Sequence, residues 1–89
     1  MKIKGKYFNG KTAKPYNVWL KIRDQNLYMI SEDQTKQKKW ALQDTHVLDE
    51  PMPPQPARLI HKHNADERLY IHTKDGWNTL KTQLPKECF

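Results

Sequence analysis

The chain has 89 residues, a net charge of +6 and a hydrophobic fraction of 36%. That length suits one small domain, which would bury roughly 60–65% of the surface of the unfolded chain. Nine aromatic residues can fill a modest core, so the composition argues against a disordered chain. No apolar run reaches the ~20 residues of a membrane-spanning helix, and no apolar signal segment follows the first residues.

Thirteen of the 16 basic residues are lysine. A lysine excess is usually a solvated surface, and the alternative is an acidic partner such as an anionic membrane, a nucleic acid or an acidic protein face. The single cysteine, Cys88, can form neither an internal disulfide nor a cysteine-based zinc site. We expect an inert thiol near a frayed chain end.

The first predicted strand covers Met1 to Phe8, where lysines at every second position alternate with Ile3, Gly5 and Tyr7. Its lysines would face water, as suits an exposed sheet edge. Asn9-Gly10 predicts a tight turn after it, because both residue types tolerate positive φ.

The centre of the predicted fold is the alternating segment Tyr16 to Ile22, in which Val18, Leu20 and Ile22 share one face. A polar turn over residues 24–26 and the apolar run 27–30 complete a hairpin. Beyond a polar turn over 31–39, residues 38–42 predict a strand with Trp40 and Leu42 inward, and residues 44–49 predict a further short strand.

Residues 51–56 contain four prolines and predict a stiff surface connection, with a domain boundary as the alternative. A second hairpin is predicted from Ala57–Lys62 and Arg68–Thr73, with Leu59, Leu69 and Ile71 facing inward.

The period then changes, because Trp77, Leu80 and Leu84 fall on one helical stripe. We predict a helix that is capped by Asp75, stopped by Pro85 and buried against the central hairpin. One more strand over 77–80 is the alternative. The whole chain, 1–89, is therefore predicted to be a single, mostly β domain of six to seven antiparallel strands with a C-terminal helix. Its outline is that of a pleckstrin-homology-like barrel, and a plain β-sandwich is the alternative.

Three histidines, His61, His63 and His72, invite a metal hypothesis, but the predicted hairpin sets His72 ~13 Å from His61. Zinc needs its ligand nitrogens ~2 Å from the ion, so we expect no metal site and no cofactor. The chain has no HExxH, no GxSxG and no glycine-rich phosphate loop, so no catalytic residue is predicted. The acidic pairs Glu32-Asp33 and Asp66-Glu67 are interpreted as solubilising turn residues.

Trp19, Lys21 and Arg23 are the candidate partner-binding residues, because they alternate with the apolar face of the central strand. An aromatic ring between basic side chains on an exposed face is typical of binding surfaces. The competing expectation, which the pattern favours, is that Trp19 is buried beneath the C-terminal helix.

The order Gly5-x-Tyr7-x-Asn9-Gly10-x-Thr12-Ala13, then Trp19-Leu20, then Trp40-Ala41-Leu42 and Val47, resembles a known domain. It is similar to a small N-terminal domain of unknown function found in bacterial membrane-associated zinc metallopeptidases. Asn9 stands where that pattern more often has Asp. The peptidase part is absent from this sequence, so the resemblance implies an accessory module and carries over no metal-binding or catalytic residue.

The predicted function is therefore that of a non-catalytic interaction module that binds a protein, such as a peptidase domain, or a membrane-proximal partner. A basic nucleic-acid-binding barrel is the alternative. We expect a cytoplasmic domain that reaches the membrane, if at all, through a longer parent protein.

Overall fold

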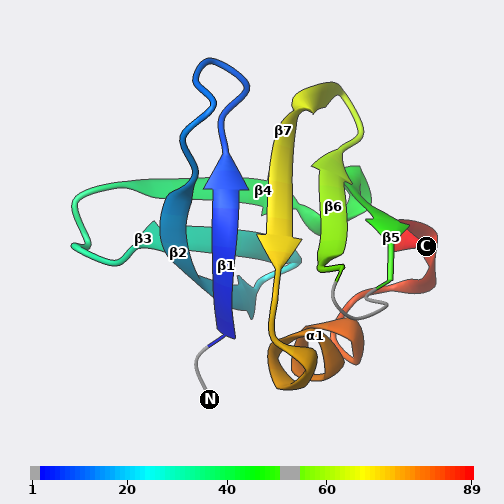
Figure 1. The fold of residues 1–89 in the computed structure, drawn as a ribbon. Coiled ribbons are helices and arrows are strands. Elements are labelled where there is room, and N and C mark those ends of the chain that lie inside the picture. The colour runs from blue at the N-terminus through cyan, green and yellow to red at the C-terminus, as the bar shows by residue number, and fades with distance from the viewer. Residues whose placement is uncertain (1–2, 51–54) are drawn as a thin grey trace.

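A computed structural model describes residues 3–50 and 55–89, and it shows a mostly β fold. Among these residues, seven antiparallel strands form one sheet in the order β4-β3-β2-β1-β7-β6-β5, which curls into a half-barrel beside a single α-helix (Figure 1). The strands are β1 (Ile3–Phe8), β2 (Tyr16–Arg23), β3 (Asn26–Ser31), β4 (Gln37–Ala41), β5 (Thr45–Asp49), β6 (Ala57–His61) and β7 (Asn64–Ile71). The fold class expected from the sequence is confirmed.

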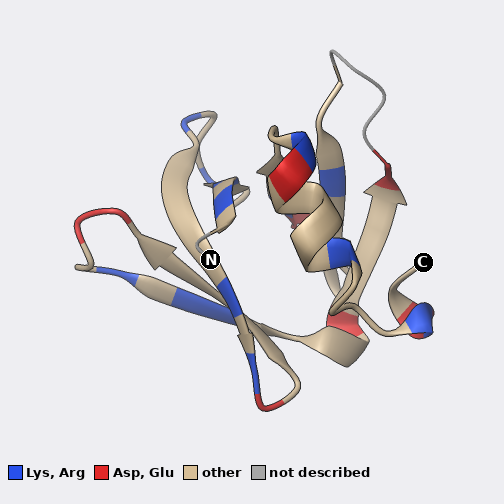
Figure 2. Ribbon diagram, turned by 90° about the horizontal axis from the view of Figure 1, so that it is seen from below, with Lys and Arg blue, Asp and Glu red and all other residues tan. Residues whose placement is uncertain are grey.

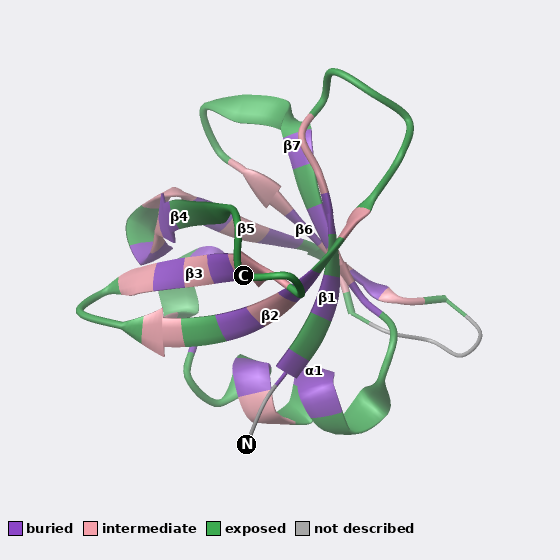
Figure 3. Cartoon of the chain, turned by 90° about the vertical axis from the view of Figure 1, so that its left-hand side faces the viewer, coloured by how far each residue is buried: buried purple, intermediate pink, exposed green. Residues whose placement is uncertain are grey.

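The alternating pattern of the central strand produces the two faces that it predicts. In β2, Val18 and Leu20 are buried at 3% and 5% exposure, while Lys21 between Leu20 and Ile22 is exposed. Figure 3 shows the same alternation of buried and exposed residues along β1. The β2–β3 turn is tight, since only Asp24 and Gln25 separate the strands, and both have positive φ as a primed turn requires.

The first strand does not lie where the sequence analysis places it. Lys4 and Lys6 are exposed as expected, but β1 lies between β2 and β7 at the centre of the sheet rather than at an edge. Its lysines therefore project from the outer face of a central strand, and the edges of the sheet are β4 and β5. The prediction of an edge strand is wrong because lysine alternation reports only which face meets water.

The connection after β1 is longer than a two-residue turn and is held locally. The side-chain oxygen of Asn9 accepts hydrogen bonds from the backbone N–H groups of Lys11 and Thr12, at 2.8 and 3.2 Å. Gly10 adopts φ 81°, and a Cβ placed on it would lie 2.6 Å from Cβ of Asp66. Glycine is therefore required at position 10 both by backbone conformation and by the close approach of β7.

The second predicted hairpin is confirmed, with a shorter turn. Leu59 pairs with Leu69, and both are fully buried together with Ile71. The sequence predicts a stiff connection over residues 51–56, with a domain boundary as the alternative. Residues 51–54 of this segment lie outside the described residues.

The C-terminal segment forms helix α1 (Lys74–Lys81), so the alternative of one more strand is wrong. Its apolar residues Trp77 and Leu80 are buried, at 2% and 0% exposure. The helix ends at Lys81 and not at Pro85 as predicted, so Leu84 lies beyond it, where it is still buried at 8% exposure. The cap is Thr73, whose side chain accepts from the backbone N–H of Gly76, and not Asp75, which lies in the first turn.

Helix α1 lies below β1 and β7 in Figure 1 and makes its main contacts with these two strands, not with the central hairpin. Beyond it, a short 3₁₀ helix (Lys86–Cys88) buries Cys88 completely, and its thiol lies 3.2 Å from the carbonyl oxygen of Leu42. The expected frayed end is therefore packed against the fold. Burial also raises the pKa of this thiol, which keeps it protonated.

We predict that Trp77→Ala lowers the free energy of unfolding by about 3–5 kcal/mol, through lost transfer energy and a cavity. A domain of this size has about 5 kcal/mol in total, so the variant should be largely unfolded. Thermal and denaturant unfolding followed by tryptophan fluorescence measure the change.

The matched control is Lys81→Ala on the exposed side of the same helix. Its ammonium lies 4.0 Å from a Glu50 carboxylate oxygen in an exposed pair, so its loss should cost less than ~0.5 kcal/mol. A native Trp77 with solvent-exposed fluorescence would contradict the buried stripe.

Candidate functional site

The outer side of the sheet brings the three predicted partner-binding residues onto one surface. Trp19 of β2 pairs with Lys4 of β1 and Ile30 of β3, and Lys21 pairs with Tyr28. Paired residues of neighbouring strands project to the same side of the sheet, so these side chains form one surface. We name it the outer basic face, and it consists of Lys4, Lys6, Trp19, Lys21, Arg23, Tyr28, Ile30 and Lys39.

Trp19 is half-buried on this face, so the expectation that it lies beneath the helix is wrong. Helix α1 packs on the opposite side of the sheet, where a Cβ on Gly76 would lie 3.3 Å from Ile3 and 3.6 Å from Ile71. The ammonium of Lys4 lies 5.1 Å from the centroid of the Trp19 ring, within the range of a cation–π contact.

Lys21 and Arg23 follow Trp19 along the same side of β2, and both are exposed. Arg23 is partly engaged, because its Nε lies 3.5 Å from a carboxylate oxygen of Asp24 in the adjacent turn. Figure 2 shows acidic residues at the loop tips of this part of the sheet and basic residues along its strands. Lys4, Tyr28, Ile30 and Lys39 were not predicted, because strand register, rather than spacing within one segment, brings them here.

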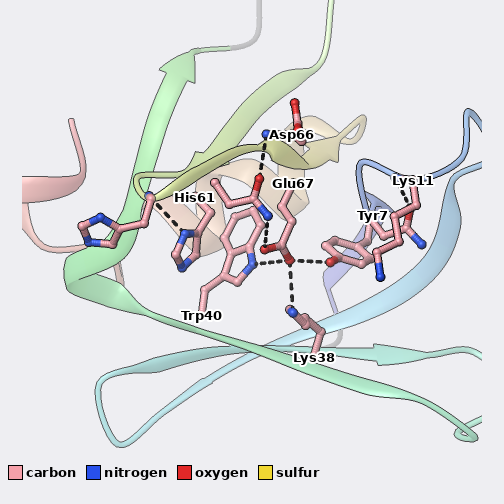
Figure 4. Close-up of polar contacts among 10 residues, drawn as sticks. Tyr7, Lys11, Lys38, Trp40, His61, Asp66 and Glu67 are labelled. Atoms are coloured by element: carbon pink, nitrogen blue, oxygen red, sulfur yellow. Dashed lines mark hydrogen bonds and ion pairs between the residues drawn. The ribbon is translucent and has the colours of Figure 1, made fainter.

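The inner side of the sheet holds a second polar arrangement, which sequence analysis missed. Glu67 of β7 is only 8% exposed, and its carboxylate accepts a 2.5 Å hydrogen bond from the hydroxyl of Tyr7. The Trp40 indole N–H and the Asn64 side-chain amide donate to it at 3.4 and 3.2 Å. The Lys38 ammonium completes the set at 3.3 Å (Figure 4).

We call Tyr7, Lys38, Trp40, Asn64 and Glu67 the Glu67 cluster. Its members come from β1, β4 and β7, so one carboxylate joins the edge strand β4 to two strands at the middle of the sheet. The interpretation of Glu67 as a solubilising turn residue is therefore wrong, whereas Asp66 beside it is exposed. The signal was present in the sequence, because Glu67 has the same parity as the inward Leu69 and Ile71.

The electrostatics of the Glu67 cluster favour a charged carboxylate. Burial alone would raise the pKa of Glu67, but hydrogen bonds from Tyr7 and Trp40 and the positive charge of Lys38 outweigh burial and hold the pKa below its ordinary value of 4.5. Burial, followed by the hydrogen bond to Glu67, raises the pKa of Tyr7 well above its ordinary value. Tyr7 is thus a permanent hydrogen-bond donor to a permanent anion near neutral pH.

Beside the Glu67 cluster, the open mouth of the half-barrel forms a pocket of about 190 Å³. We call it the mouth pocket, and its lining residues are Tyr7, Asn9, Tyr16, Val18, Met29, Ser31, Lys36, Gln37 and Lys38. The ammonium of Lys36 lies 5.4 Å from the centroid of the Tyr16 ring. Sites for drug-sized ligands occupy ~300–1,000 Å³, so this pocket suits a single side chain rather than a large cofactor.

The histidines lie as the predicted hairpin requires. Ala57 pairs with Ile71, which sets His72 at the far end of the hairpin from His61 and His63. The rings of His61 and His63 lie 5.8 Å apart, and Nε2 of His63 is 3.1 Å from a carboxylate oxygen of Asp44. Within residues 3–50 and 55–89, no three His, Cys, Asp or Glu side chains come together as a metal site would require.

Comparison of the chain with protein-family models, with curated proteins and with solved structures found no match. No helix among the described residues is long and apolar enough to cross a membrane. The features that bear on function are therefore the outer basic face, the Glu67 cluster and the mouth pocket.

We predict that Tyr7→Phe destabilises the fold by ~1.5–3 kcal/mol at neutral pH, because a buried carboxylate loses a hydrogen-bond donor. The control is Tyr28→Phe, which removes a hydroxyl from the half-buried ring on the outer face and should change stability by less than ~0.5 kcal/mol. Chemical denaturation of both variants measures the difference. Equal effects would mean that the Tyr7–Glu67 hydrogen bond contributes nothing specific.

The stabilisation from Glu67 should depend on pH with a definite sign. Because the pKa in the folded state lies below 4.5, the contribution is present above pH 4.5 and is lost as the pH falls through the folded-state pKa. Wild type should therefore exceed Glu67→Gln in stability at pH 7, and the gap should narrow toward pH 3.

Denaturation midpoints at several pH values test this, with the exposed Asp33 unchanged in both proteins. The pKa of Asp33 is held at about 2 by hydrogen bonds from Ser31 and Thr35, so its titration is common background. A stability gap that is the same at pH 7 and pH 3 would contradict a charged Glu67.

Proposed function

We propose that this chain is a non-catalytic interaction module whose outer basic face binds an acidic surface or segment of a partner protein. The observation that carries the proposal is the register of β1 to β4, which sets Trp19, Ile30 and Tyr28 side by side. Lys4 pairs with Trp19, and Lys21 and Lys39 pair with Tyr28. The centres of protein interfaces are enriched in tryptophan, tyrosine and arginine.

The charge of this face supports an acidic partner. The face carries five basic residues, Lys4, Lys6, Lys21, Arg23 and Lys39, and Arg23 forms an ion pair with Asp24 at the hairpin turn. An acidic partner would be attracted toward such a face, and the positions of the charges would fix the orientation in which it docks. A solvated lysine surface needs no aromatic centre, whereas Trp19 and Tyr28 leave apolar area half-exposed here.

The resemblance to the N-terminal domain of membrane-associated metallopeptidases extends this proposal. On that basis the partner is a peptidase domain or another protein at a cytoplasmic membrane surface, and any membrane attachment belongs to a longer parent protein. The present chain supplies binding, and the chemistry belongs to the peptidase.

A nucleic-acid-binding role is the second candidate, and it is favoured by the combination of a half-exposed tryptophan with surrounding lysines. The position of Lys4 weighs against it. Its ammonium already lies over the Trp19 ring, so a stacking base would have to displace it. A protein face that supplies carboxylates can instead use Lys4 where it lies.

The test uses a labelled 12-residue peptide of alternating glutamate and valine with one central leucine, and anisotropy as the readout. Trp19→Ala should weaken binding roughly tenfold or more, as loss of a central interface residue does. Lys21→Glu should weaken it similarly. Lys74→Glu on helix α1 is the matched control, because it changes the charge equally away from the outer basic face.

Two further probes separate the partner classes. A single-stranded 20-nucleotide DNA and vesicles containing phosphatidylserine replace the peptide at low and physiological salt. Micromolar DNA binding that collapses as salt rises would favour the nucleic-acid role. Equal effects of Lys21→Glu and Lys74→Glu would show that net charge, not this face, governs binding and would overturn the proposal.

A further inference from the structure

Strand β4 is an edge of the sheet, because β3 is its one neighbour within the described residues. The backbone hydrogen bonds at the two ends of β4 show which of its residues bond to β3. Ser31 donates its N–H to the carbonyl of Lys36, and Leu42 donates to the carbonyl of Gln25. In an antiparallel ladder the hydrogen-bonded pairs alternate, so residues 36, 38, 40 and 42 face β3.

It follows that the backbone N–H and C=O groups of Gln37 and Lys39 point toward the free edge. The next outward residue, Ala41, is already engaged, because its carbonyl accepts a 3.0 Å hydrogen bond from the hydroxyl of Thr45. The open stretch of the edge is therefore short. It can pair with two or three residues of an added strand.

The mouth pocket lies beside this open stretch. Lys36, Gln37 and Lys38 form one wall. The rest is formed by the aromatic and aliphatic residues Tyr7, Tyr16, Val18 and Met29 together with the polar residues Asn9 and Ser31. Side chains of a strand alternate between its two sides, so an added strand would send one side chain inward at this point. The volume of about 190 Å³ suits one apolar side chain.

Lysines on an edge strand usually protect it against unwanted pairing. Here three lysines lie at or next to the edge strand, Lys36 just before β4 and Lys38 and Lys39 within it, and two of them turn away from the edge. Lys36 lies over the ring of Tyr16, and Lys38 reaches the carboxylate of Glu67. Both residues line the mouth pocket, and because the charge of Lys38 is already paired with Glu67, Lys36 is the one whose ammonium would attract an anionic residue next to an apolar one. Lys39 remains exposed on the outer side.

We propose that an extended, acidic segment of the partner protein adds to the free edge of β4 and inserts one apolar side chain into the mouth pocket. Main-chain hydrogen bonds to Gln37 and Lys39 supply the pairing, and the pocket selects the side chain. The proposal depends on the acidic partner of the proposed function, and it adds the mode of binding and a second site of contact.

The backbone arm of the test compares Gln37→Pro with Gln37→Ala. Proline removes the outward N–H but no hydrogen bond to β3, since position 37 faces away from β3. With the glutamate–valine peptide that carries a central leucine, Gln37→Pro should weaken binding at least tenfold and Gln37→Ala should leave it unchanged. Melting temperatures confirm that both variants are folded.

A second measurement needs no variant of the protein. In the wild type, the amides of Gln37 and Lys39 should exchange with solvent rapidly when free and slowly with the peptide bound, whereas Lys38 and Trp40 should be protected in both states. Two further versions of this peptide carry N-methyl groups on alternate residues, one version on the odd positions and the other on the even positions. One version should bind, and the other should not. Equal binding of both versions would overturn strand addition.

The pocket arm compares Tyr16→Ala with Tyr28→Ala, two half-buried tyrosines on opposite sides of the sheet. Tyr16→Ala, and replacement of the central leucine of the peptide by alanine, should each weaken binding at least tenfold. If only Tyr28→Ala and Lys21→Glu weaken binding, the outer basic face stands and the edge site is wrong. If the peptide binds to neither, the proposed function fails together with this inference.

Discussion

The buried carboxylate of Glu67 is the contact on which the closure of this half-barrel depends. Strand β4 and strand β7 are separated by three strands in the sheet order, yet side chains of β1, β4 and β7 converge on one carboxylate. A buried anion is costly unless it is paired and hydrogen-bonded, and here three donors and one cation satisfy it. All of these groups therefore stabilise the curled form of the sheet together, because each of them satisfies the same buried carboxylate.

The same carboxylate shapes the surfaces on which binding is proposed. By engaging Lys38, Glu67 draws an edge-strand lysine across the mouth of the half-barrel and away from the backbone of β4. By engaging Tyr7, it fixes one wall of the mouth pocket. A network made only for stability would not need to leave an apolar hollow beside an open strand edge. Stability and accessibility are thus linked through one residue.

The sequence predicted what depends on local periodicity and missed what depends on long-range pairing. Alternation correctly placed Val18, Leu20 and Leu59 inside, and the 3.6-residue period correctly placed Trp77. Sheet order is not encoded in any one segment, so β1 was expected at an edge. Trp19, Lys21 and Arg23 could be chosen from the sequence as candidate binding residues, which stays a prediction, whereas their neighbours on the outer basic face depend on register. Glu67 was missed because it was interpreted from its residue type and its place next to a turn. Its alternation in step with the inward residues Leu69 and Ile71 would have indicated burial.

The two faces of the β2–β3 hairpin show how a chain with few apolar residues can fold and still present the surface on which binding is proposed. Alternation commits every second residue to the core, where Val18, Leu20 and Met29 are nearly inaccessible. The residues between them project to the other face and are exposed or only partly buried, so aromatic and basic side chains can occupy them at little cost in stability. Because the tight turn fixes the register, Trp19 and Tyr28 keep their relative positions without support from a loop. The proposed binding surface, built on paired strands, is therefore preorganised, and preorganisation would reduce the entropy lost on binding of a partner.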